Sequence, residues 1–230
     1  MSETSAGPAT RTAKGTTSTL PVTRAQAVIA RRASESRATV PDFTVRTQAL
    51  PEARGVGSSP ATITALVVRA CGLALREHPA LNGAYRDARL ERYSRVNVGV
   101  MVEAPGMVVV PTLFDADTKD AATISAELAV LAVRVRSGQI TQPELSGATF
   151  TVSNVGMLGV DAIVPVIVPP QAGILGVGQL RDQLVVVDGA AVVRPAMELT
   201  LVCDHRAVYG ADAARFLARV AELLGTAEEA

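Results

Sequence analysis

One histidine in the chain lies in a setting that suits proton transfer. His205 is in the stretch LTLVCDHRAVYGADAARF (199–216) and is one of only two histidines among 230 residues. An alternating apolar run precedes it and a small-residue helix start follows, so the imidazole falls where a strand gives way to a loop, a common place for catalytic groups. An unperturbed imidazole, with a pKa of about 6.5, can accept a proton near neutral pH. A lone histidine beside a turn is nonetheless more often structural, so position alone leaves both interpretations open.

The other residues that could do chemistry favour no separate site. His78, in REHPALN, stands just before a proline and suits a solvated or capping role. Cys71 and Cys203 are too far apart in sequence for a metal-ligand cluster or a disulfide framework, and we expect no metal. The glycines of GILGVGQL (173–180) lack the G-x-G-x-x-G spacing and no helix follows them, which excludes a dinucleotide fingerprint.

Hydrophobic periodicity predicts the elements that must position these residues. Apolar residues at helical spacing predict helices over 24–36, 61–77, 124–135 and 210–224, the first with Thr23 as its cap. Alternating or continuous apolar runs predict strands at 40–50, 95–103, 107–113, 148–154, 163–168, 173–180, 184–193 and 197–203. Asp188-Gly189 is a strong hairpin signal inside 184–193. The order predicts an α/β fold with a mixed sheet covered by helices, forming one domain over 21–230 behind a disordered polar tail at 1–20.

Composition limits the partners and the location. Lys and Arg total 22, as do Asp and Glu, so no net field favours nucleic acid or an anionic membrane surface. No apolar run approaches about 18 residues, which argues against a membrane span. The first twenty residues lack the apolar core of a secretory signal. We therefore expect a soluble, cytoplasmic protein.

Several stretches, taken in order, resemble one family. FTVSNVGMLG (150–159), PPQAGILGVG (169–178), and DHR (204–206) followed by Gly210-Ala211 are closely similar to the catalytic domain of dihydrolipoamide acyltransferases, the acyl-transferring component of 2-oxo-acid dehydrogenase complexes. The earlier stretches LPVTRAQAVIARRASES, REHPALN, RVNVGVMVE and VVVPTLFDADTK agree with it. The resemblance runs from about Leu20 to about Leu224.

The resemblance implies a fold, an assembly and a chemistry. The implied fold is that of chloramphenicol acetyltransferase, assembled as a homotrimer with active sites in channels between subunits. His205 matches the family's general base, which deprotonates the attacking thiol or hydroxyl, and Ser153 matches the hydroxyl that donates to the oxyanion of the tetrahedral intermediate. The acyl donor would be acetyl-CoA. The family usually has Asp, sometimes Asn, four residues after the histidine, where this chain has Tyr209. Arg24 is the candidate for the arginine that pairs with that acidic residue.

Three functional hypotheses follow from the resemblance. The polar start suggests no lipoyl attachment on this chain, and the charged end, LLGTAEEA, suggests a discrete trimer. Together with Tyr209 they favour a free-standing acetyltransferase that acts on a small-molecule hydroxyl, as in tetronate-type antibiotic biosynthesis. The alternative is a catalytic core of a 2-oxo-acid dehydrogenase complex that acylates dihydrolipoyl groups. The third hypothesis is a non-catalytic trimeric scaffold.

Overall fold

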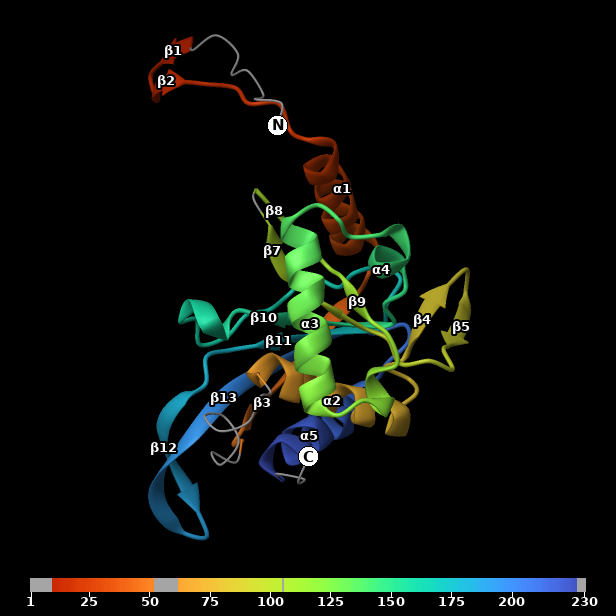
Figure 1. Cartoon of the computed structure of the whole chain (residues 1–230), viewed down its shortest axis with the longest axis vertical. Coiled ribbons are helices and arrows are strands. Elements are labelled where there is room, and N and C mark those ends of the chain that lie inside the picture. The colour runs from red at the N-terminus through yellow and green to blue at the C-terminus, as the bar shows by residue number, and fades with distance from the viewer. Residues whose placement is uncertain (1–9, 52–61, 105, 227–230) are drawn as a thin grey trace.

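The protein has an α/β fold built on one mixed sheet (Figure 1). A computed structural model describes residues 10–51, 62–104 and 106–226. The strand order is β12-β13-β11-β10-β6-β9, and β3 also pairs with β13. The strands are β3 (Asp42–Ala49), β6 (Val98–Val100), β9 (Thr112–Leu113), β10 (Phe150–Asn154), β11 (Gly173–Val177), β12 (Arg181–Val187) and β13 (Ala190–Asp204). This architecture confirms the predicted mixed sheet covered by helices.

The described chain has five α-helices, and the second, third and fifth of them contribute side chains to the main core. They are α1 (Arg24–Thr39), α2 (Ile63–Glu77), α3 (Ala121–Arg136), the short α4 (Gln142–Ser146) and α5 (Gly210–Gly225). α2 contacts both α3 and α5, and α5 contacts β3. Two short 3₁₀ turns, η1 (Ala116–Thr118) and η2 (Gly156–Leu158), and three small hairpins complete the described chain. The hairpins are β1 (Thr10–Thr12) with β2 (Gly15–Thr17), β4 (Gly83–Arg86) with β5 (Arg89–Arg92), and β7 (Val102–Ala104) with β8 (Met107–Val109).

Local sequence explains most of these boundaries. The side chains of Thr23, Thr62 and Asp120 each accept a backbone hydrogen bond at the start of a long helix, as good N-caps do. Asp188 and Gly189 have φ values of 50° and 80°, the left-handed pair that a tight hairpin turn between β12 and β13 requires. The predicted hairpin is therefore confirmed.

Three predicted strands differ from the structure, and one of them, 107–113, is divided into β8 and β9. Residues 163–168 form no strand, because Pro165 has no N–H to donate and the segment crosses the sheet instead of joining it. The crossing is close: a Cβ on Gly176 would lie 2.5 Å from the backbone oxygen of Ile163. The predicted strand 95–103 is interrupted at Met101, so β6 joins the main sheet and β7 pairs with β8. The β4–β5 hairpin and α4 were not predicted.

The N-terminal region stands apart from the body (Figure 1). α1 is tied to the rest by few bonds, among them Ser36 Oγ to the Ile167 carbonyl at 2.8 Å and Gln26 Nε2 to the Gly106 carbonyl at 2.9 Å. Residues 10–17 of the predicted disordered tail form the exposed β1–β2 hairpin, and residues 1–9 lie outside the described chain. The division into a tail and a domain from residue 21 stays a prediction. Within the described residues, no helix has the length and apolarity needed to span a membrane.

Candidate active site

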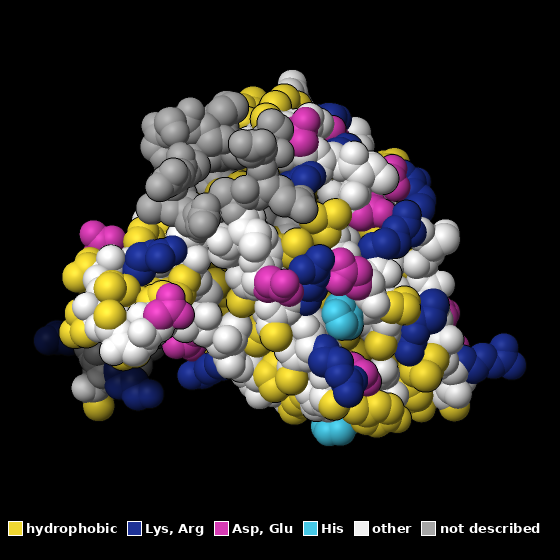
Figure 2. All heavy atoms as spheres, turned by 90° about the horizontal axis from the view of Figure 1, so that it is seen from below, with side chains coloured by type: hydrophobic (Ala, Val, Ile, Leu, Met, Phe, Trp, Pro, Cys, Tyr) yellow, Lys and Arg dark blue, Asp and Glu magenta, His cyan; other side chains and the backbone are white. Residues whose placement is uncertain are grey.

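His205 directly follows the last residue of β13, and strand pairing fixes its backbone. The preceding Asp204 donates its N–H to the Ala172 carbonyl at 2.9 Å, and the His205 N–H donates to the Pro41 carbonyl at 2.9 Å. The imidazole is exposed and contacts two aromatic rings: Phe43, with centroids 4.6 Å apart, and Tyr209, with centroids 5.9 Å apart. The predicted base thus lies on the surface of a single chain. Figure 2 shows both histidine side chains reaching the surface, amid interspersed charges of both signs.

The turn that carries His205 is held by an ion pair whose carboxylate is buried. Asp204 is 2 % exposed and accepts hydrogen bonds from the backbone N–H of Arg206, and from Arg206 Nε at 2.9 Å and Nη2 at 2.7 Å. These bonds raise the pKa of the Arg206 guanidinium. The guanidinium also lies over the ring of Tyr85, 4.6 Å from its centroid. Charge, hydrogen bonding and stacking together define the shape of this turn.

Ser153 lies near the end of β10, where that strand leaves the sheet. It is 3 % exposed and pairs in register with Gly176 of β11. The neighbouring Asn154 fixes the strand end, because its Nδ2 donates to Thr64 Oγ1 at 3.0 Å and its Oδ1 accepts the Gly156 N–H at 2.9 Å. The serine hydroxyl is therefore placed by a rigid strand end.

His205 and Ser153 belong to opposite ends of the sheet in one chain. Ser153 is level with Gly176, which is level with Thr200 of β13, and His205 follows Thr200 by five residues. Strand geometry then separates the two backbones by about 16 Å along the strand and about 10 Å across it. No single substrate atom can contact both side chains within one chain, because hydrogen bonds span only about 3 Å.

The structure places the two remaining predicted residues differently. Tyr209 stands at the N-cap of α5, is 60 % exposed and presents its ring edge-on to His205. Arg24 is the exposed first residue of α1, and within the described chain it makes no hydrogen bond or ion pair with Tyr209. Tyr209 therefore lies beside the predicted base, and the role suggested for Arg24 stays a prediction.

The cysteines do not contribute a nucleophile. Cys71 and Cys203 are both buried, and burial raises the pKa of each thiol, that of Cys203 to about 12. Both thiols therefore stay protonated at neutral pH. Among the described residues, no three His, Cys, Asp or Glu side chains gather as a metal site would need. Of the side chains that the sequence proposed for the chemistry, the imidazole of His205 and the hydroxyl of Ser153 remain the candidates.

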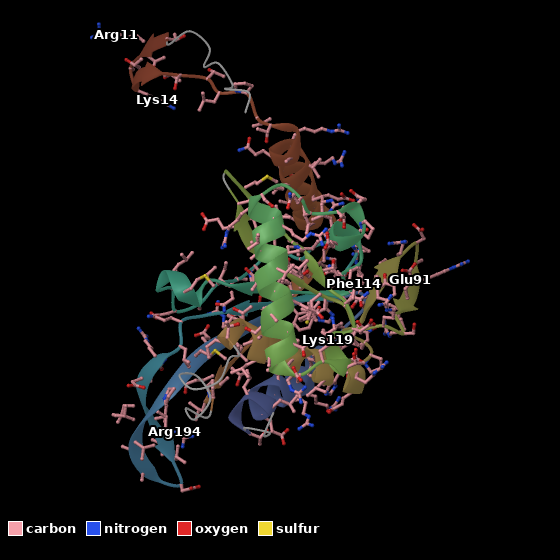
Figure 3. All side chains as sticks on the ribbon, viewed as in Figure 1. Arg11, Lys14, Glu91, Phe114, Lys119 and Arg194 are labelled. Atoms are coloured by element: carbon pink, nitrogen blue, oxygen red, sulfur yellow. The ribbon has the colours of Figure 1, made fainter. Side chains whose placement is uncertain are left out.

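Phe43 and Tyr85 contact the site but carry no signal in the sequence. Each reaches the His205 turn from a segment far away along the chain, so only the fold brings them there. The cavity described next lies away from the candidate residues His205 and Ser153. A cavity of about 360 Å³ lies against α3 beside Phe114 and Lys119 (Figure 3), and neither His205 nor Ser153 lines it.

Sequence comparison decides the family. The family described as 2-oxoacid dehydrogenases acyltransferase (catalytic domain) matches residues 14–230. The chain belongs to this family. The resemblance seen in the sequence is thereby confirmed, and the geometry above is that of a catalytic domain of this acyltransferase family.

Curated relatives of this acyltransferase domain are longer proteins. The chain is 40 % identical over 165 residues to the lipoamide acyltransferase component of the branched-chain alpha-keto acid dehydrogenase complex of Pseudomonas aeruginosa, which covers 71 % of the chain and 39 % of the relative. It is 35 % identical over 214 residues to dihydrolipoyllysine-residue acetyltransferase component 5 of the pyruvate dehydrogenase complex of Arabidopsis thaliana, covering 90 % and 46 %. The chain thus spans less than half the length of either protein.

Solved structures confirm the fold of the acyltransferase domain. The cubic core of the pyruvate dehydrogenase multienzyme complex superposes with a TM-score of 0.88 at 32 % identity, covering 93 % of both chains. The structure of Azotobacter vinelandii dihydrolipoamide acetyltransferase superposes with a TM-score of 0.85 at 30 % identity, and the match covers 92 % of both chains. That structure comes from a study of the roles of one serine, one histidine and one asparagine in the catalytic mechanism. Chloramphenicol acetyltransferase, at 14 % identity and a TM-score of 0.51 over 84 % of this chain and 94 % of its own, shares the fold alone.

Proposed function

We propose that this domain transfers an acyl group between CoA and the thiol of a dihydrolipoyl group. One observation carries the proposal. In the Azotobacter vinelandii enzyme the studied serine and histidine are separated by the same number of residues as Ser153 and His205, and its asparagine follows the histidine by four residues, as Tyr209 does here. The relatives named above are dihydrolipoyllysine-residue and lipoamide acyltransferase components, which supports the same acceptor.

The two candidate side chains suit the two demands of the reaction. The His205 imidazole takes the proton of the attacking thiol, whose sulfur then bonds to the carbonyl carbon of acetyl-CoA. The Ser153 hydroxyl donates to the oxygen that becomes negative in the tetrahedral intermediate. When the intermediate collapses, the carbon–sulfur bond to CoA breaks and the imidazolium returns its proton to the CoA thiolate. No metal takes part in this scheme.

The scheme requires His205 and Ser153 from adjacent copies in a homotrimer. Their separation within one chain supports this arrangement, as does the similarity to a cubic multienzyme core. Exposed apolar side chains beside Ser153 also favour a covering partner, because Met157 is 78 % and Leu158 68 % exposed. His205 would then supply the base from the neighbouring subunit.

A small-molecule hydroxyl is the second candidate acceptor. The sequence favoured it, with tetronate-type biosynthesis as the setting. The names of the relatives support the dehydrogenase-complex alternative instead. Tyr209 is the one observation that still favours a different acceptor, because a phenol replaces the asparagine of the Azotobacter vinelandii enzyme beside the base. The cytoplasmic location, the lack of nucleic-acid or membrane partners and the discrete trimer stay predictions.

A comparison of the two acceptors tests the proposal. The protein is incubated with acetyl-CoA and either dihydrolipoamide or a hydroxymethyl tetronate, and CoA release and acetylated product are measured together. We expect acetylation of dihydrolipoamide and its loss in His205→Ala. Acetylation of the tetronate alone would establish the second candidate, and equal CoA release by wild type and His205→Ala with every acceptor would favour the non-catalytic scaffold.

A further inference from the structure

We propose that Tyr85 is a positioning residue for His205 and that it acts through Arg206. The inference rests on the proposed function, in which His205 is the base. Tyr85 lies in the β4–β5 hairpin, at the edge of the molecule where Glu91 is labelled (Figure 3). Nothing in the sequence of this hairpin suggests a link to the catalytic turn, since more than a hundred residues separate them.

The first step is the contact between ring and guanidinium. Arg206 Cζ lies 4.6 Å from the centroid of the Tyr85 ring, well inside the range in which an arginine is attracted to an aromatic face. Arginine suits this position because its planar guanidinium can stack on a ring and bind a carboxylate in its own plane at the same time.

The second step is the pair of hydrogen bonds that the same guanidinium donates to the Asp204 carboxylate. Arg206 Nε and Nη2 both donate to the Asp204 carboxylate, which is almost completely buried. The Asp204 carbonyl also accepts the N–H groups of Ala207 and Val208, both at 3.0 Å, which closes the turn. His205 lies between the two members of this pair, so the turn cannot change shape without disturbing the pair.

The third step is the rigidity of the hairpin that carries Tyr85. The Gly83 carbonyl accepts the Ala172 N–H at 2.9 Å, and the Ala172 carbonyl accepts the Asp204 N–H at 2.9 Å, so backbone bonds run from β4 to the catalytic turn. The hairpin itself is tight, because a Cβ on Gly83 would lie 2.3 Å from the Glu91 carbonyl oxygen. The Tyr85 ring is therefore fixed relative to Asp204.

The imidazole depends on this support. Within the described chain, neither ring nitrogen of His205 forms a hydrogen bond with another residue, and the rings of Phe43 and Tyr209 lie beside it. Its direction is therefore set mainly by the turn. A loss of the Tyr85 stack lets Arg206 and the turn move, and a displacement of about 1 Å can lower a rate by about a hundredfold.

Matched tyrosine variants test the proposal. Tyr85→Phe keeps the aromatic face, whereas Tyr85→Leu removes it at similar bulk. Tyr93→Leu is the control, since Tyr93 follows the same hairpin and donates its hydroxyl to Glu91, while the ring that stacks on Arg206 is that of Tyr85. We expect Tyr85→Leu to lower kcat for acetyl transfer to dihydrolipoamide by about tenfold with KM for both substrates within about twofold. Tyr85→Phe and Tyr93→Leu should stay within about twofold of wild type.

A second readout does not require activity. Because the chain has only two histidines, NMR of ¹³C-labelled imidazole shows two signals, and His78→Gln assigns them. We expect the His205 signal to shift or broaden in Tyr85→Leu but not in Tyr85→Phe or Tyr93→Leu. Arg206→Lys, which keeps the charge but loses the planar stack, should reproduce the effect and serves if Tyr85→Leu does not fold.

The outcomes separate the two claims. An unchanged kcat and an unchanged His205 signal in Tyr85→Leu would overturn the positioning role, and so would equal losses in Tyr85→Leu and Tyr85→Phe, which would assign the effect to the phenol hydroxyl. If the wild type transfers acetyl to neither acceptor, the proposed function fails. The NMR comparison then still decides whether Tyr85 fixes the imidazole.

Discussion

At the scale of single residues, His205 is placed by its backbone more than by its side chain. The end of β13 and the Asp204–Arg206 pair hold the turn, while the imidazole lies beside the rings of Phe43 and Tyr209. No other described residue takes up a ring nitrogen, so either one can bond to an incoming group. The arrangement suits an acceptor that approaches from outside the chain.

The two histidines provide a matched pair for mutation. We expect His205→Ala to lower kcat for acetyl transfer by about 10²- to 10⁴-fold, the usual contribution of general base catalysis. His78→Ala should leave kcat within about twofold, because His78 is at the C-cap of α2 and packs edge-on against Phe216. Stopped-time assays with dihydrolipoamide measure both. Similar losses in the two variants would contradict the role of His205.

Cys203 predicts a dependence of stability on alkaline pH. Burial, with the adjacent Asp204 carboxylate, raises the pKa of its thiol to about 12, while the unfolded thiol ionises near 9. Below about pH 9 this thiol therefore does not lower the free energy of unfolding. Above that pH, the free energy of unfolding falls by about 1.4 kcal/mol per pH unit because of this thiol, up to about pH 12.

Urea unfolding at pH 8, 9.5 and 10.5 measures this effect. Cys203→Ala should show a shallower decline than wild type, since the other titrating groups are common to both proteins. Parallel declines would show that the Cys203 thiol does not control alkaline stability.

The sequence could single out candidate residues but not their surroundings. Ser153 and His205 lie in short sequence motifs, so the sequence alone could propose them as candidates. Phe43, Tyr85 and the burial of Asp204 were not predictable, because each depends on segments that meet only after strand pairing. The role suggested for Arg24 stays a prediction.

At the scale of elements, one crossing point holds the segment after Ser153 against the sheet. A Cβ on Gly178 would lie 1.8 Å from the Asp161 carbonyl oxygen, and the adjacent Gln179 donates its N–H to the Val160 carbonyl at 2.8 Å. We expect Gly178→Ala to destabilise the fold by about 2 kcal/mol or more, because backbone must move to admit the methyl group.

Gly210 is the matched control for this substitution. It begins α5, its Cβ position meets no atom within 4 Å, and alanine is the better helix former by about 1 kcal/mol. Gly210→Ala should therefore keep or raise the midpoint of thermal unfolding, while Gly178→Ala lowers it. Equal midpoints would contradict the close crossing.

Elements with a clear period could be predicted from sequence, and those without one could not. The alternation in β13 and the Asp188-Gly189 turn gave a hairpin that the structure contains. The apolar run 163–168 has the composition of a strand but is placed by Pro165 and by close contact with Gly176, which no periodicity reports. Apolar composition alone does not decide whether a segment becomes a strand, because that also depends on its pairing partners.

At the scale of the whole molecule, several apolar surfaces lack a cover in a single chain. Leu184, Val186 and Val193 on the β12–β13 ribbon are 65–76 % exposed, and Leu20 and Val22 before α1 are 65 % and 70 % exposed. Both regions extend away from the body, the ribbon near Arg194 (Figure 3). Such surfaces are typical of interfaces between subunits. They agree with a site that is completed by a neighbouring copy.

Mixed trimers test most directly whether His205 and Ser153 act together across a subunit boundary. Ser153→Ala and His205→Ala proteins, each nearly inactive, are unfolded together in equal amounts, refolded and assayed for acetyl transfer to dihydrolipoamide. In a cyclic trimer with shared sites, random mixing leaves about one quarter of the sites with both intact residues. We predict recovery of about one quarter of wild-type activity in the mixture but not in either variant refolded alone, and no recovery in the mixture would contradict the shared site.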